Sequence, residues 1–358
     1  MGGTVVGFMN NYGCYTHGAT ALAVSYPHMD VAIGYGKNTK RNPKKAALQC
    51  TNMIKKQLMN SKYKNKFLFN LVSGASVMRI PGQGEKKVVE SGLVSKFAQL
   101  TFNTTQYLLQ KGFGREDEVF AEIIDIMPEY SMILGTTMDD YRALRNYQFF
   151  NKKVITNAVL NLGIITNLDI NTCTSHGMKK TDKKFELTKV NKYIIKEINY
   201  KSARQELIRI LNFPEKFLTD EKILRIIPYY PISIKKEERE IPLVMPGILG
   251  NSVLVPSIVN IGEASILTVT GTDIVNSINK NLLDSCSIIP NFIIFSSCMT
   301  IIDTLGAKIN IFREKIIDKF DYLPFIMIFS AGEGTYSQLT GINYANMSVN
   351  SATFGHHK

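Results

Sequence analysis

The chain has 358 residues, of which 45% are hydrophobic and 20% charged, and these values exclude a disordered chain or a coiled coil. A chain of this length is longer than one that usually folds around a single hydrophobic core, which predicts two domains. The formal net charge of +12 raises the question of an acidic partner. The basic residues are scattered in short pairs, however, which favours a solvated surface over a nucleic-acid site.

The cysteines and the apolar stretches indicate the type of protein. The five cysteines are far apart and form no C-x-x-C pair, which argues against a disulfide framework and against a zinc site. The N-terminus lacks the basic and apolar regions of a secretion signal. The longest apolar stretch, 288–302, is too short and too polar to span a bilayer. We therefore expect a cytoplasmic protein with no membrane contact, no metal and no cofactor.

Four segments carry apolar residues at helical spacing, which predicts amphipathic helices. The first is Pro43–Leu58, which begins with a proline, a residue favoured in the first turn. The second, 116–127, begins with three acidic residues that complement the helix dipole. The others are 202–211, which begins with a Ser cap, and 306–320.

Short apolar stretches bounded by polar, Gly or Pro residues predict strands at 67–72, 130–134, 291–295 and 325–329. Longer segments that mix small, polar and apolar residues, as exposed antiparallel strands do, lie at 154–162 and 343–354, and an alternating segment lies at 168–172. Because helices and strands alternate, we predict an α/β fold of the α+β-like kind. The long hairpins favour mixed or antiparallel sheets covered by helices.

An order of helix, strand, glycine turn and further strand occurs twice, once in 116–162 and once in 306–354. The turns of these copies are predicted at 135–140 and 330–336. The start of the chain looks like a third copy without its helix, with a strand at 19–26. Recurrence in a fixed order predicts duplicated units and hence two related domains.

A domain boundary is predicted where prolines are dense. The segment between Leu211 and Pro246 holds five prolines and a charged run at 235–240, which oppose continuous regular structure. We therefore place the first module at 1–212, a Pro-rich connection at 213–246 and the second module at 247–358.

The common catalytic motifs are absent from the sequence, which has no P-loop, no complete dinucleotide-binding glycine motif and no G-x-S-x-G elbow. Four loops still place polar or reactive groups after predicted strands. These groups are Gly332-Glu333, Ser297-Cys298, Thr136 with Asp139 and Asp140, and His176.

Each loop has a functional and a structural interpretation. The carboxylate of Glu333 could bind an amine or guanidinium group, or it could be a solvated turn residue. The thiol of Cys298 would need a nearby base and a lowered pKa to act as a nucleophile, and a buried structural thiol is the alternative. Asp139 could bind a cation or cap its own backbone. His176 could enter a pocket or bind backbone.

Taken in order, these strand ends resemble the FIST family. Ser297-Cys298, a helix from Gly306, the turn Gly332-Glu333 and the strand at 343–349 follow the order of the C-terminal FIST module. Upstream, the order of the N-terminal FIST module is matched by Gly135 with Asp139 and Asp140, the strands at 147–162, Ser175-His176-Gly177 and then Leu187-Thr188-Lys189. The resemblance covers nearly the whole chain, with 1–212 as the N-terminal and 247–358 as the C-terminal module.

The sequence departs from the family pattern at three places. The Arg that usually follows Ser-Cys is absent from 299–304, where Asp303 stands. Tyr12-Gly13-Cys14 occupies the place of an expected Gly-Glu. The resemblance also puts the first strand and helix of the N-terminal module before Met1.

The resemblance implies an intracellular sensory protein that binds a small polar ligand, of the amino acid class, and signals through a protein partner. The site it implies comprises Ser297, Cys298, Gly332, Glu333, Tyr336, Asn346, Gly135, Thr136, Asp139 and His176. We favour non-enzymatic binding, with the amine of the ligand held by Glu333. An interaction scaffold without a small ligand is one alternative, and an enzyme that uses Cys298 or His176 is the other.

Overall fold

The computed structural model describes residues 1–77, 88–89, 92–218, 223–236, 239–344 and 346–357. It confirms a mixed α/β fold with several mixed sheets. The chain divides into two compact units, each built from separate segments. Unit 1 comprises Met1–Ser76, Gly114–Gly177 and Gly271–Lys358, and unit 2 comprises Val77–Phe113 and Met178–Thr270. The linear module boundaries at 212 and 246 stay a prediction.

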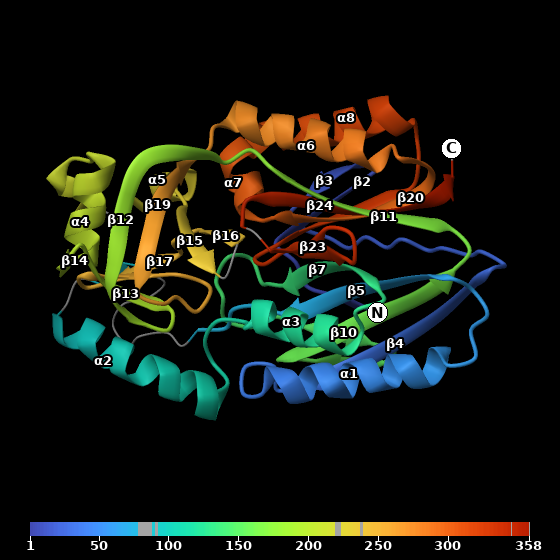
Figure 1. Cartoon of the computed structure of the whole chain (residues 1–358), viewed down its shortest axis with the longest axis horizontal. Helices are drawn as coiled ribbons and strands as arrows, with labels where there is room; N and C mark the ends of the chain where they lie inside the picture. Colours follow the sequence, from blue (N-terminus) through green and yellow to red (C-terminus); the bar gives the residue numbers. More distant parts are fainter. Residues whose placement is uncertain (78–87, 90–91, 219–222, 237–238, 345, 358) are drawn as a thin grey trace. The chain divides into compact units, whose positions relative to one another are not determined.

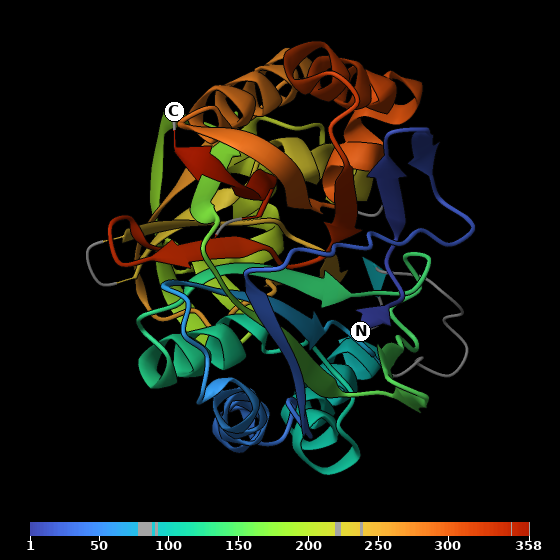
Figure 2. The ribbon, with the colours of Figure 1, turned by 90° about the vertical axis from the view of Figure 1, so that its right-hand side faces the viewer.

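Two mixed sheets lie face to face in the described part of unit 1 (Figure 2). We call the first the N sheet; in spatial order its strands are β23 (Gly341–Tyr344), β22 (Gly334–Ser337), β7 (Ser131–Thr137), β5 (Asn65–Ser73), β10 (Ala158–Thr166) and β4 (Met29–Lys37). We call the second the C sheet; its strands are β11 (Asp169–His176), β24 (Ser348–His357), β20 (Ile288–Cys298), β21 (Phe325–Ser330), β2 (Gly7–Asn10) and β3 (Gly13–Tyr15). A small sheet is formed by β1 (Gly2–Gly3), β8 (Gln148–Phe150) and β9 (Lys153–Ile155).

Helices cover the outer face of each sheet, which gives unit 1 the layer order helix, sheet, sheet, helix (Figure 1). The N sheet is covered by α1 (Pro43–Leu58) and α3 (Glu116–Ile126). The C sheet is covered by α6 (Gly271–Ser285), α7 (Thr300–Leu305), the 3-10 turn η4 (Gly306–Ile309) and α8 (Asn310–Phe320). Among the described residues, no helix has both the length and the apolar character needed to cross a bilayer.

Aromatic and branched side chains fill the space between the two sheets. Phe67 and Ile133 of the N sheet pack with Phe292 and Phe354 of the C sheet. The rings of Phe292 and Phe354 stack with centroids 4.4 Å apart, and the ring of Phe67 meets Phe354 edge-on. Alternate strand residues therefore face this inner core, while the opposite faces pack against helices.

The same strand order occurs in both sheets of unit 1. In the N sheet, β5 and β7 are parallel, β10 pairs antiparallel with β5, and β4 lies outside β10. In the C sheet, β20 and β21 are parallel, β24 pairs antiparallel with β20, and β11 lies outside β24. The two predicted copies of helix, strand, turn and strand thus occupy matching positions in the two sheets.

Each sheet is completed by a hairpin from elsewhere in the chain. The β22–β23 hairpin follows β21 of the C sheet but pairs with β7 of the N sheet. The β2–β3 hairpin, from the first residues, pairs with β21 of the C sheet. The two halves of unit 1 therefore depend on each other for their edge strands.

The strand predicted at 19–26 for a third copy is wrong. Residues 19–26 form no strand, and the strand begins after Pro27, as β4. Leu22 and Tyr26 instead pack partly buried against the core between the sheets. Burial of these two side chains therefore explains part of the apolar pattern of 19–26, and the backbone of this segment pairs with no described strand. The first turn of the chain instead joins β2 to β3, where Asn10 lies opposite Gly13.

The helix predictions are confirmed for Pro43–Leu58 and, to within one residue, for 116–127. Asn42 caps α1 by accepting a 2.9 Å hydrogen bond from the amide of Lys45. Helix 202–211 is present as α4 (Ala203–Leu211), but Ser202 makes no side-chain cap. The helix predicted at 306–320 is present as the 3-10 turn η4 followed by α8. Gly306, with φ of 52°, separates it from the preceding α7.

Several strands continue beyond their predicted ends. β7 runs through Thr137, so Gly135 and Thr136 belong to a strand and not to the predicted turn. β20 and β11 likewise extend to Cys298 and His176. The predicted strand at 154–162 is interrupted by Asn157, whose φ is 50°, and that at 343–354 by Met347, whose φ is 58°. Ladder partners far away in sequence supply the extra pairing.

Unit 2 is built on another mixed sheet. In spatial order its strands are β16 (Arg239–Leu243), β15 (Ile232–Lys236), β19 (Gly262–Thr268), β12 (Lys179–Asn191), β13 (Ile194–Ile198), β18 (Ser252–Leu254), β17 (Gly247–Leu249) and β6 (Val88–Val89), with β14 (Lys201–Ser202) beside β13. Its helical segments are α2 (Gly92–Thr104), η1 (Thr105–Leu109), α4, η2 (Glu215–Leu218), α5 (Ile223–Ile226) and η3 (Ile227–Tyr229). The Pro-rich segment 213–246 therefore contains a regular hairpin; β16 tolerates Pro242 because it is an edge strand. Residues 237 and 238 of the charged run lie outside the described residues.

Candidate functional site

The parallel strand pairs of unit 1 end in polar residues. In the N sheet the carboxyl end of β5 carries Ser73, which lies opposite Thr137 of β7. In the C sheet Cys298 ends β20 and lies opposite Ser330 of β21. Functional sites of α/β proteins lie just outside the carboxyl ends of parallel strands. These strand ends therefore locate the candidate site.

The turn that follows β21 is fixed by Thr136 of β7. The hydroxyl oxygen of Thr136 accepts hydrogen bonds from the amides of Ala331 at 2.8 Å and Gly332 at 3.0 Å. The hydroxyl of Ser330 donates to the carbonyl of Gly332 at 3.2 Å. The C sheet strand thus delivers Glu333 to a position set by a side chain of the N sheet.

Glu333 is completely buried, and Cys298 lies beside its carboxyl group with 3% of its surface exposed. The amide of Ser348 donates to Oε1 of Glu333 at 3.4 Å. Burial, reinforced by the negative charge of Glu116, raises the pKa of Glu333 well above its usual range. Burial and the neighbouring Glu333 likewise raise the pKa of the Cys298 thiol. Both shifts favour the neutral form of the group.

A second buried carboxyl group comes from the first residue of α3. Glu116 is 5% exposed, and its side chain lies against Gly332, where an added Cβ would come within 2.7 Å of Oε1. The Tyr344 hydroxyl donates to the same oxygen at 3.5 Å. Burial first, and then the charge of Asp117, raise the pKa of Glu116 to about 8.

Lys40 adds a buried positive charge near Glu116. Lys40 is only 1% exposed, and its Nζ donates a hydrogen bond to the carbonyl of Gly74 at 2.8 Å. Its attraction for the ionised form of Glu116 lowers the pKa of that carboxyl, but less than burial raises it. We call Glu116, Glu333, Cys298 and Lys40 the acid cluster.

The acid cluster contains oxygen atoms without a hydrogen-bond partner. Among the described residues, Oε2 of Glu116 and Oε2 of Glu333 are both buried and accept no hydrogen bond. Most buried polar atoms in proteins are satisfied, so two unsatisfied carboxyl oxygens in one cluster require an explanation. No group of three or more His, Cys, Asp or Glu side chains in the described ranges could hold a metal ion.

The structure brings together part of the residue set predicted from the sequence. Cys298, Gly332, Glu333 and Thr136 meet at the acid cluster, as described above. Ser297 is buried, and its hydroxyl donates to the carbonyl of Ser348 at 3.5 Å. Gly135 packs against Ser296 of the C sheet. A Cβ atom added to Gly135 would lie 3.1 Å from the hydroxyl oxygen of Ser296. Asn346 is 3% exposed.

Three predicted residues have other roles. The carboxylate of Asp139 accepts hydrogen bonds from the amides of residues 143–145 at 2.6–3.0 Å, so it caps its own turn. The Tyr336 hydroxyl donates to the carbonyl of Pro128 at 3.1 Å, and its ring packs on the core beneath α3. His176 is exposed and lines a surface groove.

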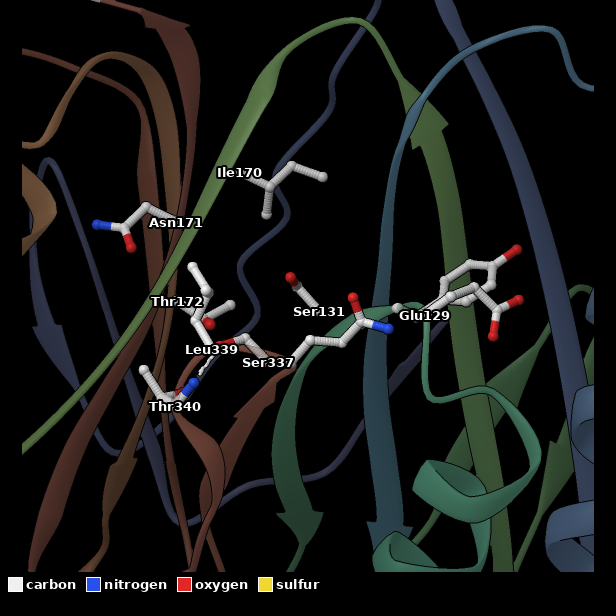
Figure 3. A pocket seen from close by; sticks show the side chains of 10 residues that line it. Glu129, Ser131, Ile170, Asn171, Thr172, Ser337, Leu339 and Thr340 are labelled. Atoms are coloured by element: carbon white, nitrogen blue, oxygen red, sulfur yellow. Dashed lines mark hydrogen bonds between the residues drawn. The ribbon is translucent and has the colours of Figure 1, made fainter.

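That groove runs between β11 and the β22–β23 hairpin. One part has a volume of about 250 Å³ and is lined by the residues shown in Figure 3, among them Glu129, Ser131, Ile170 and Leu339. A second part, of about 690 Å³, includes His176 and Asp284. The two parts share three residues, Asn171, Thr172 and Thr340. The lining mixes polar and apolar side chains, and among the described residues none of those that line it has a buried side-chain N or O atom without a hydrogen-bond partner.

The sequence of the first part of the chain identifies the family. Residues 1–201 match the model of the FIST N domain. The chain belongs to the FIST family. A FIST N domain is a signalling and sensory domain. In this FIST protein the match ends at residue 201, and a C-terminal FIST module is not detected. No curated protein matches the chain.

Two members of the acid cluster are not evident from the sequence of this FIST protein. Glu116 was expected only to complement the dipole of its helix, and Lys40 lies in a loop without any motif. Both are brought to the site by tertiary packing. One local signal is Gly114, because a Cβ there would lie 2.3 Å from Oε2 of Glu116. A glycine two residues before a helix-starting acid is too common a pattern to identify a site alone.

Proposed function

We propose that this protein is a sensor that binds a small, amine-bearing polar ligand at the acid cluster and releases it unchanged. The observation that carries the proposal is the pair of buried carboxyl oxygens, on Glu116 and Glu333, that accept no hydrogen bond among the described residues. Leaving a buried polar atom unsatisfied costs about 1–3 kcal/mol. A protonated amine supplies several donors and a positive charge, so one ligand group can satisfy both oxygens.

The amino acids are the ligand class that we propose, because every one of them carries such an amine. A charge-assisted hydrogen bond to a carboxylate contributes on the order of 1.5–3 kcal/mol. The amides of Ala331 and Gly332 are already bound to Thr136, so they support no contact with the carboxylate end of a ligand. The proposal therefore rests on recognition of the amine.

The environment of Cys298 supports binding without catalysis. A nucleophilic cysteine needs a lowered pKa, whereas burial and Glu333 raise the pKa of this thiol. We expect a thiol-reactive probe near neutral pH to label Cys14 and Cys286, which are half-buried, before Cys298. Rapid and selective labelling of Cys298 would instead favour a cysteine-dependent enzyme.

We also propose that residues 247–358 are a divergent C-terminal FIST module. The support is the matching strand order of the two sheets, in which β20 and β21 correspond to β5 and β7. Ser297-Cys298 and Gly332-Glu333 follow these strands in the order that the resemblance implies. If the module is a functional half of the sensor, substitution of Glu333 must abolish ligand binding as completely as substitution of Glu116.

Calorimetric titration of the full chain with the twenty common amino acids tests the sensor proposal. At least one is expected to bind, while its α-hydroxy acid analogue, which lacks the amine, is expected to bind at least about tenfold more weakly. Glu333→Gln and Glu116→Gln are expected to abolish binding. Glu122→Gln, on the same helix as Glu116, is the matched control and is expected to bind normally.

The raised pKa values provide a second measurement in the same experiment. An ammonium group stabilises the ionised carboxylates, so binding is expected to release protons from the acid cluster. The binding enthalpy will then depend on the ionisation enthalpy of the buffer, for instance between phosphate and Tris. Absence of binding by all twenty amino acids, or binding unchanged in Glu333→Gln, would refute the proposal.

A further inference from the structure

Helix α2 and the π-helical turn η1 that continues it present their polar side to the sheet of unit 2. Ser95 is 3% exposed and Gln106 is 5% exposed. The side-chain amide of Gln99 donates to the carbonyl of Leu249 at 3.0 Å and to the hydroxyl of Ser252 at 3.2 Å. These acceptors belong to β17 and β18, and α2 lies below β17 in Figure 1. A surface helix normally buries its apolar side, so the orientation of α2 is reversed.

Most of the exposed side chains described in these two elements are apolar. Six large side chains are exposed by between 58% and 83% of their surface: Leu93, Phe97, Leu100, Tyr107, Leu108 and Leu109. We call these six residues the α2 stripe. Four of them, Leu93, Phe97, Leu100 and Tyr107, recur with Thr104 at intervals of four, three, four and three, and Leu108 and Leu109 follow directly. Within α2, from Leu93 to Thr104, this spacing is that of the heptad seam by which one helix packs against another.

We propose that the α2 stripe is the interface through which two copies of this chain form a two-fold symmetric dimer. Most soluble homo-oligomers are two-fold dimers in which the same patch of both copies meets itself. Six side chains of this size and exposure offer on the order of 700 Å² of accessible surface, close to the roughly 800 Å² that each partner buries in a standard interface. A heptad seam supplies the shape that a second α2 fits.

The charges around the stripe favour a second copy over a membrane surface. Lys96 is the one charged residue in the sequence from Gly92 to Leu109, so two stripes can meet with little repulsion despite the net charge of +12. A helix that lies in a membrane interface carries many Lys and Arg residues on its polar side. The polar side of α2 holds Ser95 and Gln99 instead, and both face the protein.

Sedimentation velocity of the full chain over a range of micromolar concentrations tests the dimer. The wild type is expected at twice the 40.2 kDa of one chain. The double variant Leu93→Gln/Leu100→Gln keeps helix propensity, and its dimer is expected to dissociate at least about thirtyfold more readily. The matched control is Leu283→Gln on α6, where the leucine is 63% exposed. It is expected to dimerise as the wild type does.

A crosslink gives a second readout that does not depend on stability. Leu100 lies at the middle of the seam, so it faces its own copy whether the two helices run parallel or antiparallel. Under mild oxidation Leu100→Cys is expected to form an intermolecular disulfide, whereas the wild type and Leu283→Cys are not. A wild type that stays monomeric overturns the proposal, including one that instead sediments with anionic vesicles. A double variant that dimerises like the wild type overturns it as well. The dimer and ligand binding are tested separately, so either can fail alone.

Discussion

Replacement of Glu116 by Gln is expected to change how the stability of the protein depends on pH. The unfolded chain ionises this carboxyl near pH 4.5, whereas burial and Asp117 raise its pKa to about 8 in the folded protein. Below pH 4.5 the group is protonated in both states and has no effect. As pH rises, the unfolded chain loses the proton first, so the free energy of unfolding falls until the folded group ionises near pH 8. The full loss corresponds to about 5 kcal/mol.

Glutamine has the size of the protonated acid but does not ionise. The Glu116→Gln variant is therefore expected to unfold with the same free energy as the wild type at pH 4.5, and to exceed it by up to about 5 kcal/mol at pH 8. Urea unfolding followed by far-UV circular dichroism at several pH values measures both curves. The control Glu122→Gln should follow the wild type. Parallel curves for Glu116→Gln and the wild type would refute the inference that Glu116 is held neutral by burial.

Three further predictions concern the framework of the site. Thr136→Val leaves two buried amides without an acceptor, so thermal unfolding should show a loss of about 1–3 kcal/mol, which Thr136→Ser should largely restore. Asp139→Ala removes three hydrogen bonds to its own turn and should cost about 1–3 kcal/mol while calorimetry shows ligand affinity unchanged; a loss of affinity would contradict its capping role. A chain ending at residue 201 lacks the partners of β2 and β11 and should show no cooperative unfolding transition by circular dichroism; a sharp transition would contradict this dependence.

Helices were predictable from sequence where their signals are local. α1 begins at Pro43 after a capping Asn42, and its apolar residues recur at helical spacing up to Leu58. The start of α3 is marked by its three acidic residues. The positions of the strands were predictable but their ends were not, because the length of a strand depends on partner strands far away in the chain. Thr136 extends β7 because it pairs with Val72, and the sequence around Thr136 contains no local signal for this pairing.

The sequence predicted those residues of the candidate site that lie at or just after the ends of strands, and missed the others. Cys298 ends one apolar strand and Glu333 follows another, so the order of motifs predicted both as site residues. Glu116 and Lys40 reach the same place from a helix start and a loop, and their burial is decided by the packing of both sheets. His176 also follows a strand, yet it lines the surface groove. A strand end therefore predicts proximity to the site, but not the direction of a side chain.

The pairing of the first strand with one of the last has a consequence for how the protein folds during synthesis. Gly7 of β2 lies opposite Phe329 of β21, so the β2–β3 hairpin has no partner strand until β21 has also left the ribosome. At roughly 5–20 residues per second, that wait lasts tens of seconds. During this time the apolar residues Val6, Phe8 and Met9, which are buried in the finished protein, remain uncovered. Chaperone binding to the nascent β2–β3 hairpin is therefore expected during synthesis of this protein.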